Sequence, residues 1–147
     1  MKTLKDLLGW LLVTLLLLQL IQIRVPEPPK ASKADEIKAP KEVMEILRSS
    51  CYDCHSNHTK WPWYSKISPI SLEVNSHVKN GRAWLNFSIW NRYSKEKQKK
   101  LYQDIEDAIN LRMPPANYLW VHKESRLKRS QRDLIKEWAR KEQEKLK

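Results

Sequence analysis

The chain has 147 residues, enough for one modest domain with a short appendage. Its two glycines are too few for a glycine-rich phosphate loop or a turn-rich β-barrel, and its two cysteines cannot build a disulfide framework. The net charge is +11, but the basic residues are interleaved with glutamates, as at Lys136-Glu137, which is typical of a solvated helix face and argues against nucleic acid as a partner.

The N-terminal segment, residues 7–23, is uncharged and mostly apolar, and it follows a short basic tail, residues 1–6. A transmembrane helix needs about 17 to 25 such residues, so the segment is at the short end of that range. A cleaved signal peptide is the alternative, but no small-residue cleavage site lies close behind Ile23. We therefore expect an uncleaved transmembrane anchor over residues 7–23, with the tail in the cytoplasm.

Residues 24–39 are rich in proline and charged residues and have no apolar period, which predicts an extended, semi-rigid linker. A single domain is then expected over residues 40–147. Its apolar residues recur three or four positions apart, and no alternating pattern of strand length is present. The sequence therefore predicts an all-α domain.

Four helices are expected in this domain. The first begins at Pro40, the second ends at Gly81 in a C-cap, the third is capped by Ser94 and terminated by the pair Pro114-Pro115, and the fourth opens with a capping box over Ser130–Asp133. The residues expected on their apolar faces are Val43, Leu47, Cys51, Ile70, Val74, His77, Val78, Leu101, Ile105, Ala108, Ile109, Leu134, Ile135 and Trp138.

Cys51-Tyr52-Asp53-Cys54-His55 is the C-x-x-C-H motif of covalent c-type haem attachment. Cysteines three positions apart share one face of a helical turn, so both sulfurs can reach the two vinyl groups at one edge of a haem. His55 then ligates the iron through a neutral ring nitrogen. Attachment of this kind takes place outside the bacterial inner membrane, so the motif predicts one covalent haem c in a periplasmic domain.

Two other chemistries are compatible with paired cysteines. A redox dithiol is one, but no βαβ pattern surrounds the pair. A zinc site is the other, with Cys51, Cys54, His58 and a distant ligand such as His77, although zinc motifs usually supply a second close pair of ligands. Haem attachment is the interpretation that the spacing favours.

Met113 is the candidate for the sixth iron ligand. It follows the third helix, and the next two residues are prolines, which block helix continuation and stiffen the loop. His77, on the apolar face of the second helix, is the alternative sixth ligand; a lone histidine there is also compatible with a hydrogen bond to a haem propionate or with a plain core position. A thioether ligand would raise the reduction potential relative to a second histidine.

An aromatic-rich stretch separates the motif from the third helix. Large rings cover the flat apolar face of a haem at low entropic cost, so this stretch is expected to cover the cofactor. Its members are Trp61, Trp63, Tyr64, Trp84, Phe87 and Trp90.

Several segments together resemble the bacterial haem-binding domain family, over about residues 40–140. These are Cys51-x-x-Cys-His-Ser-Asn, Trp61-Pro-Trp-Tyr64, Ile67-Ser-Pro69, His77-Val78, Gly81-Arg82, Leu85-Asn-Phe-Ser-x-Trp90 and Met113-Pro-Pro115. The resemblance implies a small, membrane-anchored protein with one c-type haem and a cytochrome-c-like helical fold. It does not decide between Met113 and His77, since both positions belong to the pattern.

The function expected from these features is one-electron transfer by a haem protein anchored in the inner membrane by a single span. No catalytic triad or paired carboxylates indicate another enzyme chemistry. The alternatives are a haem-based ligand sensor or peroxidase-like enzyme with an open sixth iron site, and a structural haem subunit of a larger complex. The basic charge favours an acidic periplasmic redox protein as partner.

Overall fold

The computed structural model describes residues 2–23 and 25–146; Met1, Arg24 and Lys147, which fall in the expected tail, linker and domain, lie outside them. No strand occurs in those residues, so the predicted all-α class is confirmed. The α-helices are α1 (Lys2–Leu18), α2 (Lys41–Ser50), α3 (Tyr52–His55), α4 (Ile70–Trp84), α5 (Lys95–Leu111), α6 (Ala116–Val121) and α7 (Arg129–Glu144), and the 3-10 turns are η1 (Trp63–Lys66), η2 (Phe87–Arg92) and η3 (Lys123–Ser125).

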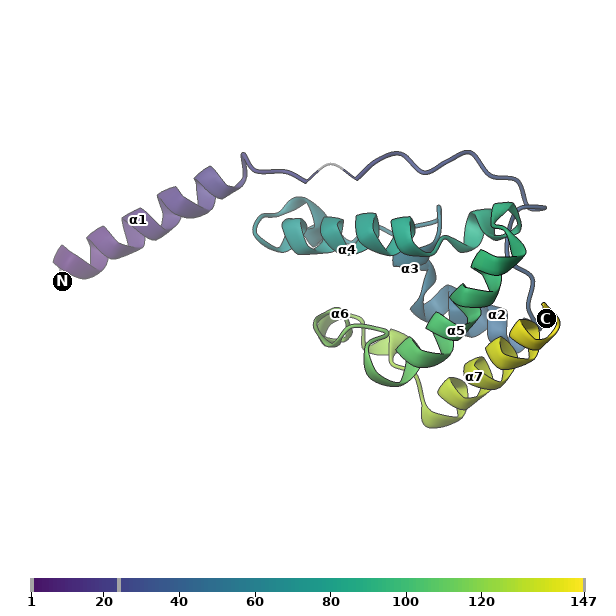
Figure 1. Cartoon of the computed structure of the whole chain (residues 1–147). Coiled ribbons are helices and arrows are strands. Elements are labelled where there is room, and N and C mark those ends of the chain that lie inside the picture. Colours follow the sequence, from purple (N-terminus) through teal and green to yellow (C-terminus); the bar gives the residue numbers. More distant parts are fainter. Residues whose placement is uncertain (1, 24, 147) are drawn as a thin grey trace.

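The N-terminal helix α1 projects from the rest of the chain, as Figure 1 shows, and its large apolar side chains are exposed. It ends at Leu18, so Gln19 to Ile23, the last part of the expected membrane segment, is not helical. Among residues 2–23 and 25–146, no helix has both the length and the apolar character needed to cross a bilayer.

The second half of the expected linker packs on the domain. Ile37 is buried in the main core, and its amide donates to the carbonyl of Phe87 at 2.9 Å. Asp35 forms an ion pair with Arg92 at 2.8 Å, and its backbone carbonyl accepts from the amide of Asn91 at 2.9 Å. An isoleucine among charged residues gains free energy by leaving water, which explains why this stretch is not a free spacer.

The core lies mainly between α5 and α7, which pack side by side, with α2 across one end (Figure 1). The apolar faces predicted for the third and fourth helices are confirmed, since Leu101, Ile105, Ile109, Ile135 and Trp138 are all buried. This two-helix base leaves α3 and α4 to pack against each other above it, and the space between the two layers is where the site forms.

Two predicted helix boundaries are wrong, the end of α4 and the start of α7. α4 continues through Gly81 to Trp84, and the chain leaves the helix at Leu85, whose backbone is extended. α5 agrees with the prediction: it begins after Ser94, whose hydroxyl accepts from Lys97 N, and it ends at Leu111, ahead of Met113 and the two prolines. α7 begins at Arg129 and is capped by Gln131, whose side-chain oxygen accepts from the Lys128 amide at 2.8 Å, in place of the expected box over Ser130–Asp133.

Candidate functional site

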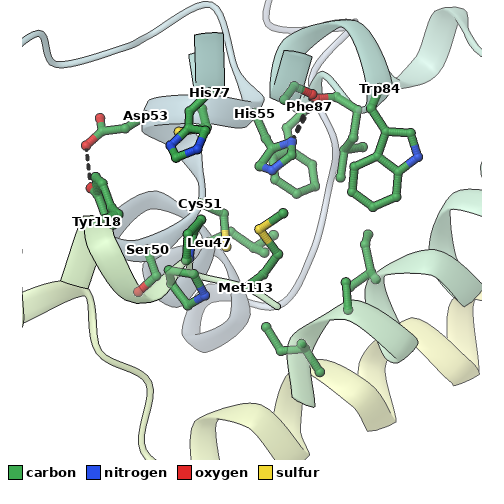
Figure 2. Close-up of a pocket in the computed structure, with 18 of the residues that line it drawn as sticks. Leu47, Ser50, Cys51, Asp53, His55, His77, Trp84, Phe87, Met113 and Tyr118 are labelled. Carbon is green, nitrogen blue, oxygen red and sulfur yellow. Dashed lines mark hydrogen bonds between the residues drawn. The ribbon is translucent and has the colours of Figure 1, made fainter. Parts of the chain in front are cut away.

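A cavity of about 320 Å³ lies between the turn α3, the C-terminal half of α4 and the end of α5. This is within the range of about 300–1,000 Å³ that ligand sites occupy. Its walls are largely apolar, and Cys51, Cys54, His55, His77 and Met113 all line it. The five residues singled out from the sequence are therefore brought together, and Figure 2 shows those labelled around one space.

The turn α3 presents the two thiols. The amides of Cys54 and His55 both donate to the carbonyl of Cys51, at 3.2 and 3.0 Å, which closes the helical turn that the spacing predicts. Burial, and then the neighbouring Cys54, raise the pKa of Cys51 to about 12. Burial and the Asp53 carboxylate raise the pKa of Cys54 to about 11. Both thiols are thus protonated at neutral pH, unlike the thiolate that a redox dithiol uses.

The ring of His55 is buried and fixed in one tautomer. Its Nδ1 lies 3.0 Å from the carbonyl oxygen of Gly81 and 3.2 Å from that of Leu85. Carbonyl oxygens only accept, so Nδ1 carries the proton and Nε2 keeps its lone pair. Burial lowers the pKa of His55, against the two carbonyl contacts, which keeps the ring neutral. A neutral imidazole whose Nδ1–H is held by the backbone is the usual form of an iron-ligating histidine.

Gly81 permits the close approach of α4 to this turn. A Cβ atom at position 81 would lie 2.9 Å from the carbonyl oxygen of Cys54 and 3.3 Å from Cε1 of His55. The first separation is shorter than real Cβ contacts and the second is tighter than most of them, so a side chain would push the two elements apart. The sequence marks this glycine as a helix end, whereas its role is to let the backbone carbonyl reach the histidine.

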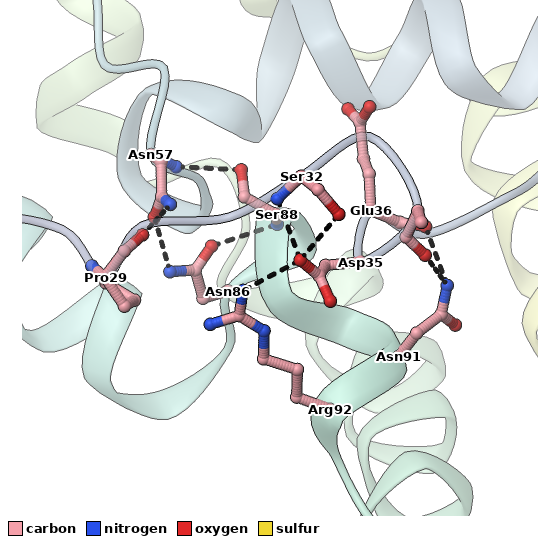
Figure 3. A network of polar contacts seen from close by, with 10 residues as sticks. Pro29, Ser32, Asp35, Glu36, Asn57, Asn86, Ser88, Asn91 and Arg92 are labelled. Carbon is pink, nitrogen blue, oxygen red and sulfur yellow. Dashed lines mark hydrogen bonds and ion pairs between the residues drawn. The ribbon is translucent and has the colours of Figure 1, made fainter.

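A buried polar network holds the segment after His55 against the segment after α4 (Figure 3). Asn86 Nδ2 donates to Asn57 Oδ1 at 2.8 Å, and the Asn57 amide donates to Ser88 Oγ at 3.0 Å. The Ser88 amide donates to Asn86 Oδ1 at 3.0 Å. Because Leu85 precedes this network directly, the network sets the position of one of the two carbonyls that hold His55. From the sequence these residues could be assigned no role beyond their place in the family resemblance.

Met113 and His77 approach the cavity from opposite walls. Figure 2 shows the Met113 thioether and the His77 ring pointing into the same space as His55. The Met113 loop is tied to α7, because the Arg132 guanidinium donates to the carbonyls of Met113, at 3.3 Å, and of Ile109. His77 is instead 38% exposed, and its Nε2 lies 4.0 Å from Oε1 of Glu73. The backbone around Met113 is therefore fixed by more contacts than the side chain of His77.

The aromatic stretch divides between two places. Trp84 and Phe87 contact the His55 ring edge-on, with centroids at 5.9 and 6.3 Å, and both line the cavity as predicted. The expectation that Trp61 and Trp63 cover the same space is wrong, because both are exposed and border a separate groove. The backbone is extended at Pro62, just before η1 begins at Trp63.

Tyr118, on α6, closes the site on the side of the motif. Its hydroxyl donates to Oδ2 of Asp53 at 3.0 Å, so an element far along the chain is tied to the residue between the two cysteines. Burial, more than Asp53 itself, raises the pKa of Tyr118, which keeps the phenol protonated as the donor. This contact links positions 65 residues apart, and nothing in the sequence pattern indicates it.

These features fit a haem better than the alternatives. The cavity is apolar, two thiols lie at one edge, and the histidine offers a free Nε2 while its other nitrogen is held. In the part of the chain that the structure describes, no group of three or more His, Cys, Asp or Glu side chains could hold a metal ion, so the zinc alternative gains no support. His58, its proposed third ligand, lies on the surface.

Comparison with protein families gives a match to the model of a haem-binding domain over residues 13–141. The match extends further toward the N-terminus than the motifs quoted from the sequence, and it includes part of α1. No curated protein and no solved structure matches the chain significantly. Because the family match spans most of the chain and agrees with the cavity around His55, the chain belongs to the haem-binding domain family.

Proposed function

We propose that this chain is a membrane-anchored c-type monohaem protein of the periplasm that carries one electron at a time, with a cytochrome-c-like arrangement of its helices around the cofactor. The observation that carries the proposal is the fixed tautomer of His55, whose Nε2 stays available for iron inside a cavity that also holds both thiols. A bound haem would supply an iron that alternates between the ferric and ferrous states.

The thiols of Cys51 and Cys54 serve as covalent attachment points. With haem bound, Cys51 and Cys54 would each hold one vinyl group through a thioether bond, and the proton of each thiol would go to the neighbouring vinyl carbon. The addition is redox-neutral and needs both cysteines reduced, which agrees with two free cysteines in the fold. Their high pKa values keep them from reacting as exposed thiolates before attachment.

Met113 completes the iron coordination in this proposal. Its loop is fixed by Arg132, and a thioether ligand favours the ferrous state, as suits an electron carrier. His77 is the alternative ligand, and it would have to give up its position beside Glu73. A filled sixth position separates this function from a ligand sensor or a peroxidase-like enzyme, both of which need that position open.

Features of the chain outside the site support the proposed anchor and the proposed partner. α1 exposes apolar side chains along its whole length, which suits contact with lipid, and residues 1–6 would stay on the cytoplasmic side. Tethering raises the local concentration of the haem domain near membrane redox proteins. The net charge of +11 favours an acidic redox protein as the partner.

The decisive experiment is a visible spectrum of the purified full chain, followed by denaturation in acid and organic solvent. We expect a low-spin haem spectrum and haem that stays with the denatured polypeptide. Haem that is extracted would contradict covalent attachment. A high-spin ferric spectrum with rapid carbon monoxide binding to the ferrous form would contradict electron transfer and favour the open-site alternative.

A further inference from the structure

One end of the domain carries a cluster of exposed apolar side chains, here called the aromatic end. Trp63 and Trp120 are 79% and 75% exposed, so most of each side chain contacts water and little of it packs on the chain. They border a groove of about 400 Å³ between η1, the start of α4 and α6. The large apolar residues exposed here are Trp61, Trp63, Ile67, Ile70, Trp120 and Val121.

The elements of the aromatic end are joined to one another, so the cluster is a fixed surface. The Tyr64 hydroxyl and His122 Nε2 are 2.5 Å apart, which joins η1 to the end of α6. Asn117 on α6 donates to Glu73 on α4. Tyr118 stacks on His122 with ring centroids 4.3 Å apart. These contacts hold the surface in place, yet Trp63 and Trp120 remain mostly exposed.

The apolar N-terminal segment reaches the chain at the same end. Gln19 Nε2 donates to the Ser68 carbonyl at 2.9 Å, and the Ser68 amide donates back to Gln19 Oε1 at 3.0 Å. The Ser68 hydroxyl donates to the carbonyl of Ile21 at 3.0 Å. Ser68 sits between the exposed Ile67 and the start of α4, so the end of α1 and the aromatic end adjoin (Figure 1).

The chemistry of this end matches the interface of a bilayer. Tryptophan is enriched at the depth of lipid headgroups, where its apolar ring and its N–H group are both accommodated. Lys60 lines the groove with the tryptophans, and Lys66 in η1 and Lys123 in η3 are also exposed; lysines at a bilayer surface attract anionic headgroups. Exposed tryptophans and lysines next to an apolar helix are features of an interfacial surface.

We propose that the aromatic end lies on the membrane surface, with Trp61, Trp63 and Trp120 among the lipid headgroups. This inference rests on the proposed membrane anchor, and it adds a second, lateral contact with the bilayer. The haem cavity and the groove share Asp53, Cys54, His77 and Tyr118 as lining residues. Contact with lipid would therefore hold the cysteine edge of the haem site close to the membrane and leave α5 and α7 facing away.

The test uses the full haem-loaded chain in nanodiscs of phosphatidylcholine and phosphatidylglycerol that contain a lipid with a photoreactive diazirine near its headgroup. After irradiation, mass spectrometry locates the lipid adducts. We expect adducts on residues 60–70 and 117–123 at several times the level on residues 95–100 and 129–144. Adducts on α1 alone would overturn the lateral contact and keep the anchor. Adducts on the aromatic end without α1 would support the contact and contradict the anchor.

Two pairs of variants refine the test. Lys60→Glu with Lys66→Glu should lower the adducts on the aromatic end at low salt, by about fivefold for each lysine that faces anionic lipid. Lys95→Glu with Lys100→Glu, the same charge change on exposed α5 positions, should leave them unchanged. An equal loss of adducts in both pairs of variants would overturn the proposal. So would an aromatic end without adducts in nanodiscs that hold two chains, because a second copy of the chain would then cover this surface.

Discussion

The backbone carbonyl of Gly81 lies 3.0 Å from Nδ1 of His55, so α4 sets the orientation of the histidine in the haem motif. The same residue must lack a side chain, because a Cβ there would lie 2.9 Å from the Cys54 carbonyl oxygen. The hydrogen bond and the close packing therefore depend on one position. A glycine in the middle of a helix costs stability, and here that cost is offset by the contact it makes possible.

Gly81→Ala should separate α4 from the haem motif. The new methyl group has no room beside Cys54 and His55, and overpacking of this kind costs about 1–3 kcal/mol. We expect a lower midpoint in denaturant unfolding and incomplete haem attachment. Gly9→Ala is the matched control, since nothing lies within 4 Å of a Cβ there and alanine favours helix. Equal effects of the two substitutions would contradict the packing role of Gly81.

The sequence predicted the site residues but not the contacts that hold them. Cys51, Cys54 and His55 are contiguous, so their spacing alone indicates their chemistry. The contact between His55 and Gly81 joins residues 26 positions apart, and it depends on how α3 and α4 pack. Asn80-Gly81 looks like a helix end because glycine commonly follows one, and only the tertiary packing shows why the helix continues.

The fold was predictable where a helix is amphipathic and capped, as α5 is after Ser94. It was not predictable where one residue decides the packing of an irregular segment. Ile37 is a single apolar residue among prolines and charges, too sparse for a periodic signal, yet it is buried in the core. Trp63 was expected to cover the haem, but composition cannot distinguish a ring that packs inside from one that lies on the surface.

Met113→Ala should open the sixth iron position, whereas His77→Ala should not. Loss of the thioether is expected to remove the low-spin ferric spectrum and to let the ferrous protein bind carbon monoxide rapidly. Met44→Ala provides a control, because Met44 packs against the core on α2 and does not line the cavity. If the low-spin spectrum is lost only in the His77 variant, Met113 is not the ligand.

Arg132→Met should loosen the Met113 loop without touching the haem site. The guanidinium bonds to the carbonyls of Met113 and Ile109 would be lost, while methionine keeps the apolar stem, so a cost of about 2 kcal/mol is expected. The specific readout is the reduction potential, which should fall as the ligand dissociates more often. The redox titration should also become broader, because two forms of the haem site are then present. Arg129→Met, at the exposed start of α7, should keep both stability and potential. An unchanged potential in the Arg132 variant would show that the loop is held by other contacts.

The ion pair of Asp35 should make attachment of the linker dependent on pH. Arg92 first, and then the Ser32 amide and hydroxyl, hold the pKa of Asp35 well below its ordinary value of 3.8. The folded chain thus binds fewer protons than the unfolded chain, so this contribution to stability is complete above the ordinary pKa and is lost as the pH falls below it. Asp35→Asn should lower the unfolding midpoint at pH 7, and its difference from the unmodified chain should shrink as the pH falls from 5 toward the folded pKa. Glu27→Gln removes a charge at an exposed linker position and should show no such convergence. A gap between Asp35→Asn and the unmodified chain that stays constant with pH would mean that the carboxylate charge does not fasten the linker to η2.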